Sequence, residues 1–201
     1  IDGKRILRLL LCVGLNGTGK TKMIEALQYL RMLAVYKPEK PTDRPAFRPF
    51  LLDEQSRYEP SELSLTYYIN NTCHYYYIKV SEKRIEEEIL KQISPNILLY
   101  HRFYNSETDT VSIKFGSDSD ISKSTQQALK LTVIQNSSVL SVFGSLNLES
   151  QSLKANYDFF NQHISLIRKS SNQKIADKLK TGNLERDLRI KNLLLQLLKD
   201  V

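Results

Sequence analysis

A chain of 201 residues with 25% charged and 41% hydrophobic residues has the composition of a soluble globular protein, with length for one core or one core plus a subdomain. No run of about eighteen apolar residues occurs, which argues against a membrane-spanning helix. The net charge of +7 suits a nucleic-acid partner. However, the basic residues are scattered, and the densest stretch, 168–180, is more typical of a solvated helix face than of a nucleic-acid contact.

The N-terminal apolar stretch Ile6–Val13 resembles the apolar part of a signal peptide, because basic residues precede it. It runs into a glycine-rich loop instead of a small-residue cleavage site, so we expect no signal peptide. Cys12, in the expected core strand, and Cys73, in a second expected strand, are too few for a disulfide framework. Two reduced cysteines predict a cytoplasmic protein.

The most specific motif follows this apolar stretch, where residues 14–21 read Gly-Leu-Asn-Gly-Thr-Gly-Lys-Thr. Phosphate-binding loops with the pattern Gly-x-x-x-x-Gly-Lys-Thr lie between a strand and a helix. Residues 9–13 predict the strand, and residues 22–33 predict the helix, with Met23, Leu27 and Leu30 at helical spacing. The helix dipole would add to the anion site. The sequence therefore predicts a site for nucleotide phosphates.

Each residue type in this loop has a physical reason. We expect Gly14 to turn the chain sharply off the strand, and Gly17 and Gly19 to let backbone N–H groups surround phosphate oxygens without an obstructing Cβ. Lys20 would reach the β- and γ-phosphates of ATP, and the Thr21 hydroxyl would bind Mg²⁺. The predicted phosphate-binding residues are Gly14, Asn16, Gly17, Thr18, Gly19, Lys20 and Thr21, of which Thr21 is also the predicted metal ligand.

Three regions can be distinguished along the chain. Residues 1–36 hold the expected strand, loop and helix. Residues 37–120 begin with a proline-rich extended connector and then alternate with a period of two, which predicts an antiparallel meander of four or five strands over Leu63–Phe115. Residues 121–201 return to helical patterns, including Ser150–Ile167 and Leu184–Leu198.

Several details of the meander can be predicted. Leu63, Leu65 and Tyr67 should share one face, and Asn70-Asn71 should form a hairpin turn. The segment Arg84–Leu90 fits a strand or a helix. The tyrosines of the meander fit cross-strand pairing, while stacking of nucleic-acid bases on them would require a basic groove between the rings. These tyrosines are Tyr67, Tyr68, Tyr75, Tyr76 and Tyr77.

No second chemistry is evident in the sequence. The three histidines have no metal-ligand spacing, and we expect His74 and His101 to be surface or cross-strand residues. Hydrolysis by a phosphate-loop enzyme also needs an acidic motif that holds Mg²⁺ and orients water. The candidate Asp53-Glu54 follows only three apolar residues and a proline, which favours the start of the meander instead. The catalytic residues are therefore unknown.

The order of these parts resembles the ABC-like AAA ATP-binding proteins of bacterial abortive-infection and OLD-type defence systems. The resemblance rests on the loop Gly14–Thr21, on Ile24–Leu27 and Phe50–Asp53, and on a tyrosine-rich hairpin that ends in Arg84–Leu90. Asn16 matches an asparagine of the family's loop. The family's signature motif, acidic motif and switch histidine are not recognisable, and the usual first strand is short or absent.

The resemblance implies an α/β P-loop NTPase, of which this chain is the N-terminal part of an ABC-like head with an antiparallel β subdomain and a helical arm. It implies binding of ATP and Mg²⁺, dimerisation around the nucleotide, and a nuclease partner or nucleic acid nearby. Alternatives are a DNA-repair ATPase of the RecF or structural-maintenance kind, a P-loop kinase for small molecules, and a non-catalytic interaction module that keeps nucleotide as a structural ligand.

Overall fold

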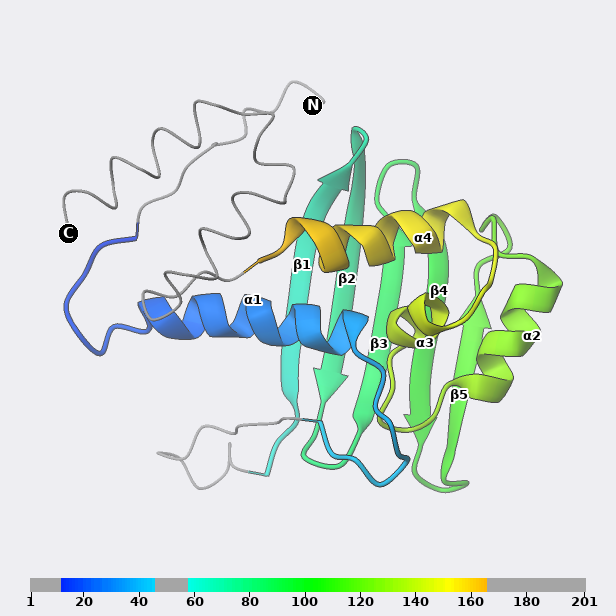
Figure 1. The fold of residues 1–201 in the computed structure, drawn as a ribbon, viewed down its shortest axis with the longest axis horizontal. Helices are drawn as coiled ribbons and strands as arrows, with labels where there is room; N and C mark the ends of the chain where they lie inside the picture. The colour runs from blue at the N-terminus through cyan, green and yellow to red at the C-terminus, as the bar shows by residue number, and fades with distance from the viewer. Residues whose placement is uncertain (1–11, 46–57, 166–201) are drawn as a thin grey trace. The chain divides into compact units, whose positions relative to one another are not determined.

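The chain forms a five-stranded sheet with helices on one of its faces, as the computed structural model of residues 12–45 and 58–165 shows (Figure 1). The protein is thus of mixed α and β structure. In chain order the elements are α1 Lys20–Val35, β1 Ser61–Ile69, β2 Thr72–Val80, β3 Ile85–Gln92, β4 Ile97–Asn105, β5 Thr110–Phe115, α2 Lys123–Thr132, α3 Val139–Ser145, α4 Gln151–Asp158 and the π-helix η1 Phe159–His163.

The predicted meander is confirmed. All neighbouring strands are antiparallel, and their order in the sheet is their order in the sequence, β1-β2-β3-β4-β5. The predicted turn between β1 and β2 is present, because Asn70 and Asn71 adopt φ angles of 46° and 67°. Positive φ at both central residues suits a tight hairpin. The ambiguous segment Arg84–Leu90 is largely strand β3.

The predicted faces of β1 are also confirmed. Leu63, Leu65 and Tyr67 are buried or half-buried, and the alternate residues Ser64 and Thr66 are exposed. The first face packs towards the helices, where most of the core lies. The largest core side chains come from β2, β3, β4, α2, α3, α4 and η1, and they include Tyr76, Ile78, Leu90, Tyr100, Leu129, Leu140, Leu153 and Phe160.

The helical predictions differ from the structure mainly in their bounds. The helix predicted over residues 22–33 begins at Lys20 and ends at Val35. The helix predicted over 150–167 is α4, which continues as η1 only to His163. The helix predicted over 184–198 and the basic stretch 168–180 lie outside the described residues.

A buried carboxylate connects the sheet to α3. Glu88 of β3 is fully buried and accepts hydrogen bonds from Tyr76 (2.9 Å), Tyr100 (2.7 Å) and the Val139 backbone N–H (2.8 Å). Burial raises the pKa of Glu88, and it also raises the pKa of both tyrosines. The three donors offset the cost of burying this group.

A buried arginine beside this carboxylate holds the loop between α2 and α3. Arg102 of β4 is the register partner of Glu88, and its guanidinium donates to the carbonyl of Ile85 and to those of Ile134 (3.1 Å) and Gln135 (2.8 Å). Burial lowers the pKa of Arg102 to about 10. The Arg102 side chain therefore ties the loop before α3 to the centre of the sheet.

Replacement of Arg102 by leucine should be strongly destabilising, because three carbonyls would each lose a charged donor and the buried Glu88 would lose its neighbouring cation. We expect Arg102→Leu to lower the free energy of unfolding by about 3–5 kcal/mol, measured by urea denaturation. The control is Arg44→Leu, which removes an exposed ion pair with Glu82 and should cost less than about 1 kcal/mol. Equal losses in the two variants would contradict the assigned role of Arg102.

Candidate functional site

The loop before α1 carries two glycines that the backbone requires. Residues 12–19 form neither helix nor strand and are exposed. Gly17 and Gly19 have φ angles of 87° and 86°. A side-chain-bearing residue rarely adopts such angles, whereas glycine does so readily. The reason for glycine at these two positions is therefore backbone conformation rather than space, since an added Cβ would meet no atom within 4 Å.

At Gly14 the reason for glycine is space rather than backbone conformation. The φ angle of Gly14 is not positive. The expectation that Gly14 makes a sharp turn in a conformation open only to glycine is therefore wrong. Instead, an added Cβ would lie 3.2 Å from Thr18 Oγ1 and 3.7 Å from Lys20 Nζ. Gly14 thus leaves space on the inner side of the loop, where these two polar side chains gather.

The Lys20 ammonium closes the loop. Its Nζ donates to the carbonyl oxygens of Gly14 and Leu15, both at 2.6 Å, and lies 3.1 Å from Thr18 Oγ1. Thr18 in turn donates to the Leu15 carbonyl at 2.9 Å. The cation is therefore held inside the curve of the loop by neutral oxygen atoms. Anionic phosphate oxygens are stronger acceptors for an ammonium group than backbone carbonyls are.

The first turn of α1 has an unusual charge for a helix N-terminus. Its N-cap is Gly19, no side chain caps the helix, and the first turn contains no acidic residue. Lys20 and Lys22 instead place positive charge beside the positive end of the helix dipole, where each costs about 0.3–1 kcal/mol. Lys22 is balanced by Glu25 at 3.0 Å. A bound anion would relieve this repulsion and accept hydrogen bonds from the uncapped N–H groups.

The strand expected over residues 9–13 falls partly within the described residues. Residues 9–11 lie outside the described residues, and Cys12 and Val13 are not in a strand. Cys12 is exposed and Val13 is 85% exposed, so the expectation that they belong to a core strand is wrong for these two residues. They have no sheet neighbour within the described part of the chain.

The expected apolar face of α1 is also only partly buried. Leu30 and Leu33 are in the core, together with Ala34 and Val35, while Met23 and Leu27 remain 56% and 38% exposed. Figure 1 shows the reason, since α1 crosses the sheet only with its C-terminal part. The N-terminal part carries the loop beyond the edge strand β1 (Figure 1).

The roles predicted for the other site residues stay predictions. The side chains of Asn16 and Thr21 are exposed at the loop and at the start of α1. Asp53 and Glu54 lie outside the described residues. Within the described ranges, no group of three histidine, cysteine, aspartate or glutamate residues could hold a metal ion.

The two strand histidines pair across strands as expected. His101 lies 2.7 Å from Glu87. His74 faces its register partner Tyr67 with ring centroids 5.8 Å apart, and it is buried rather than at the surface. Burial lowers the pKa of His74. Sequence reasoning missed the buried pair Glu88 and Arg102, for which strand alternation offered no clear signal.

A comparison of the chain with models of protein families, with curated proteins and with solved structures finds no match. In the part of the chain that the structure describes, no helix has the length and apolar character needed to cross a membrane.

The conformational requirement at Gly19 can be tested apart from any ligand. Alanine in the left-handed region costs about 1–2 kcal/mol, so Gly19→Ala should fray the first turn of α1. The bond from the Met23 N–H to the Gly19 carbonyl, now 3.1 Å, should weaken. We expect faster amide exchange at Met23, measured by NMR, and no such change in Gly14→Ala, whose backbone needs no positive φ. Faster exchange in both variants would refute this distinction.

Proposed function

We propose that the chain binds the phosphates of ATP with Mg²⁺ at the loop Gly14–Thr21. The single observation that carries this proposal is the first turn of α1, where Lys20 and an uncapped helix N-terminus meet a loop kept open by Gly14. This arrangement concentrates N–H donors and positive charge on one side of an exposed loop. It is electrostatically unfavourable without an anion.

Bound phosphate would exchange with the partners that Lys20 has now. The ammonium would leave the carbonyls of Gly14 and Leu15 for the β- and γ-phosphates, and the Thr21 hydroxyl would bind Mg²⁺. Because two hydrogen bonds at 2.6 Å must first be given up, part of the binding energy is lost to this exchange. We therefore expect the loop alone to bind ATP weakly.

The wider assignment is to the nucleotide-binding head of an ABC-like ATPase of the bacterial abortive-infection or OLD type. It is supported by the order of the parts: a phosphate loop, its helix, a connector and an antiparallel sheet, followed by helices. Such a head would dimerise around nucleotide and act with a nuclease or beside nucleic acid. Hydrolysis would need the acidic and signature motifs, which the printed sequence does not contain in recognisable form.

The role of Lys20 can be separated from its effect on folding. Lys20→Ala should weaken ATP binding by about ten- to a hundredfold, because one charged hydrogen-bond donor is worth about 1.5–3 kcal/mol. Its thermal stability should change little, because the loss of two exposed loop hydrogen bonds is offset by removal of a positive charge from a helix N-terminus. Equilibrium binding of labelled ATP and thermal unfolding are the two measurements.

Lys22→Ala is the matched control. This side chain is 81% exposed and pairs with Glu25, so we expect ATP affinity to change less than about threefold. Wild-type affinity in Lys20→Ala, or equal losses in the two lysine variants, would refute phosphate binding at the loop.

Turnover gives a second test. We expect the 201-residue chain to release no phosphate from ATP above background, because transition-state charge needs a held metal and a positioned water as well as the loop. A phosphate-release assay on the purified chain checks this. Turnover that disappears in Asp53→Asn or Glu54→Gln would show instead that these residues form the acidic motif and that the chain is a complete small enzyme.

A further inference from the structure

The sheet has a second face, opposite the helices, which we call the outer face. It is formed by the strand residues that alternate with the core residues. Across β2 to β5 it presents rings and lysines side by side, and none of these side chains is in the core. The outer face includes Tyr75, Tyr77 and Lys79 of β2, Glu87 and Lys91 of β3, His101 and Phe103 of β4, and Lys114 of β5.

Two lysines of the outer face lie over aromatic rings. The Lys91 Nζ is 5.0 Å from the centre of the Tyr75 ring, and the Lys114 Nζ is 5.3 Å from the centre of the Phe103 ring. Within the described residues, neither ammonium has a carboxylate close enough for an ion pair. The outer face therefore carries two lysine–ring pairs, one that joins β2 and β3 and one that joins β4 and β5.

The carboxylates of the same face already have partners. Glu87 is paired with His101 at 2.7 Å, and Glu62 of β1 is paired with Lys79 at 2.8 Å. At the start of β3, Glu86 is paired with Arg84 at 3.1 Å. The positive charge of Lys91 and Lys114 thus remains available to an anionic partner.

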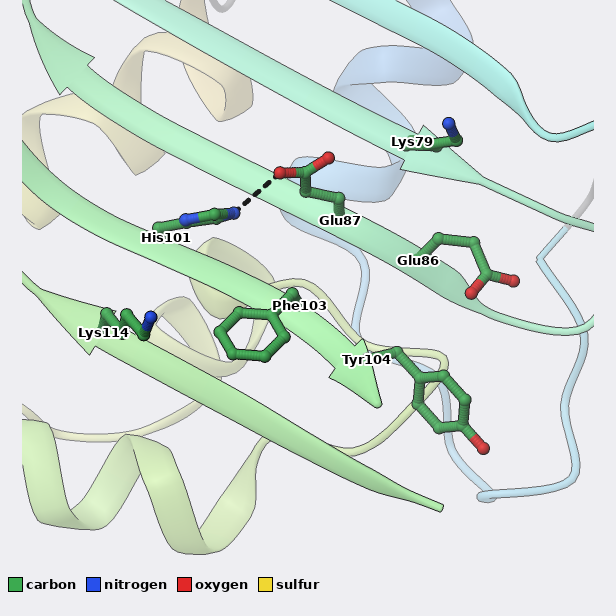
Figure 2. A pocket seen from close by; sticks show the side chains of 7 residues that line it. All are labelled: Lys79, Glu86, Glu87, His101, Phe103, Tyr104 and Lys114. Carbon is green, nitrogen blue, oxygen red and sulfur yellow. Dashed lines mark hydrogen bonds and ion pairs between the residues drawn. The ribbon is translucent and has the colours of Figure 1, made fainter. Parts of the chain in front are cut away.

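One of these pairs, Phe103 and Lys114, also borders a hollow. Figure 2 shows this open depression of about 460 Å³ over β2 to β5, with Phe103 at its centre and Lys79 and Lys114 on opposite sides. Its lining residues are Lys79, Glu86, Glu87, His101, Phe103, Tyr104 and Lys114. The volume is in the range of small-ligand sites, and an open shape suits a ligand that continues beyond it.

We propose that the outer face binds single-stranded nucleic acid. Bases stack on the rings of Phe103 and Tyr75, and the phosphates between them contact Lys114 and Lys91. Stacking tolerates any sequence because every base has a π-face, and a chain of alternating rings and phosphates complements alternating aromatic and cationic side chains. A duplex keeps its bases stacked on one another and offers these rings nothing.

This inference rests on the sheet and not on the phosphate loop. Strand pairing supplies what the sequence alone did not show, because it brings Lys91 of β3 over Tyr75 of β2 and Lys114 of β5 over Phe103 of β4. The two sites can therefore be tested separately, with nucleic-acid binding measured in the absence of ATP.

The experiment measures fluorescence anisotropy of labelled oligothymidylate of about 16 nucleotides, and of a duplex of equal length, with the full chain at several salt concentrations. We expect the single strand to bind more tightly than the duplex. Phe103→Leu should weaken single-strand binding about tenfold with the same salt dependence, because it removes a stacking ring but no charge. Lys114→Gln should reduce the slope of log K against log salt by about 0.7.

Two controls make the outcome decisive. Lys123→Gln removes an exposed lysine at the start of α2, away from the outer face, and should leave the salt slope unchanged. Lys20→Ala should bind the single strand like the wild type, whatever its effect on ATP. No binding of the single strand would overturn the proposal. Equal affinity for the duplex, or an equal loss of slope in Lys123→Gln, would also overturn it and would show instead a general electrostatic attraction to a chain of charge +7.

Discussion

The hydrogen bonds of two fully buried charged side chains, Glu88 and Arg102, determine how the helices are placed on the sheet. Neither group could be buried alone, because an unpaired charge in a protein interior costs several kcal/mol. Glu88 finds its donors in two tyrosines and the first N–H of α3, and Arg102 finds its acceptors in the loop just before α3. Burial of these two groups on the sheet therefore depends on the position of one particular loop and helix.

The same loop also contacts α1 and the connector that follows it. Ser138, the N-cap of α3, donates to the carbonyl of Leu33 at 2.7 Å near the end of α1. Asn136 donates to three carbonyls of the connector, those of Lys40, Pro41 and Asp43. A short run of polar residues thus holds both the C-terminal end of α1 and the chain that follows it. Their side chains, rather than apolar packing alone, specify this geometry.

The two ends of α1 consequently differ in their physical character. The C-terminal end is held by the core, by Ser138 and by Arg31, which donates to the carbonyl of Phe160 at 3.0 Å. The N-terminal end carries exposed Met23 and Leu27, an uncapped first turn and a loop with its own lysine folded over it. A rigid anchor at one end and an exposed, positively charged end at the other suit a helix that presents its N-terminus to an anion.

The sequence by itself determined the local features of this protein. The period-two pattern, the Asn70-Asn71 turn and the alternation along β1 are properties of neighbouring residues, and they correctly predicted an antiparallel meander. The apolar spacing after the loop motif likewise predicted a helix over residues 22–33, which the structure extends to Lys20–Val35. The tertiary structure decided the features that depend on contacts between residues distant in sequence. The core strand expected at Cys12 and Val13 is one example, because burial of a strand requires a neighbour that local pattern cannot reveal.

The buried charges are the clearest case. A register shift between Lys79 and Val80 brings Ile85 into the core out of phase with Glu88 and Leu90, so a strict alternation of faces along β3 could not have placed Ile85 and Glu88 on the same face. The same holds for the outer face, where each lysine meets its ring only through pairing of two strands. Sequence pattern determines which side chains a strand can offer to each face. Register and long-range hydrogen bonds determine which side chains meet, because those contacts join residues that are far apart along the chain.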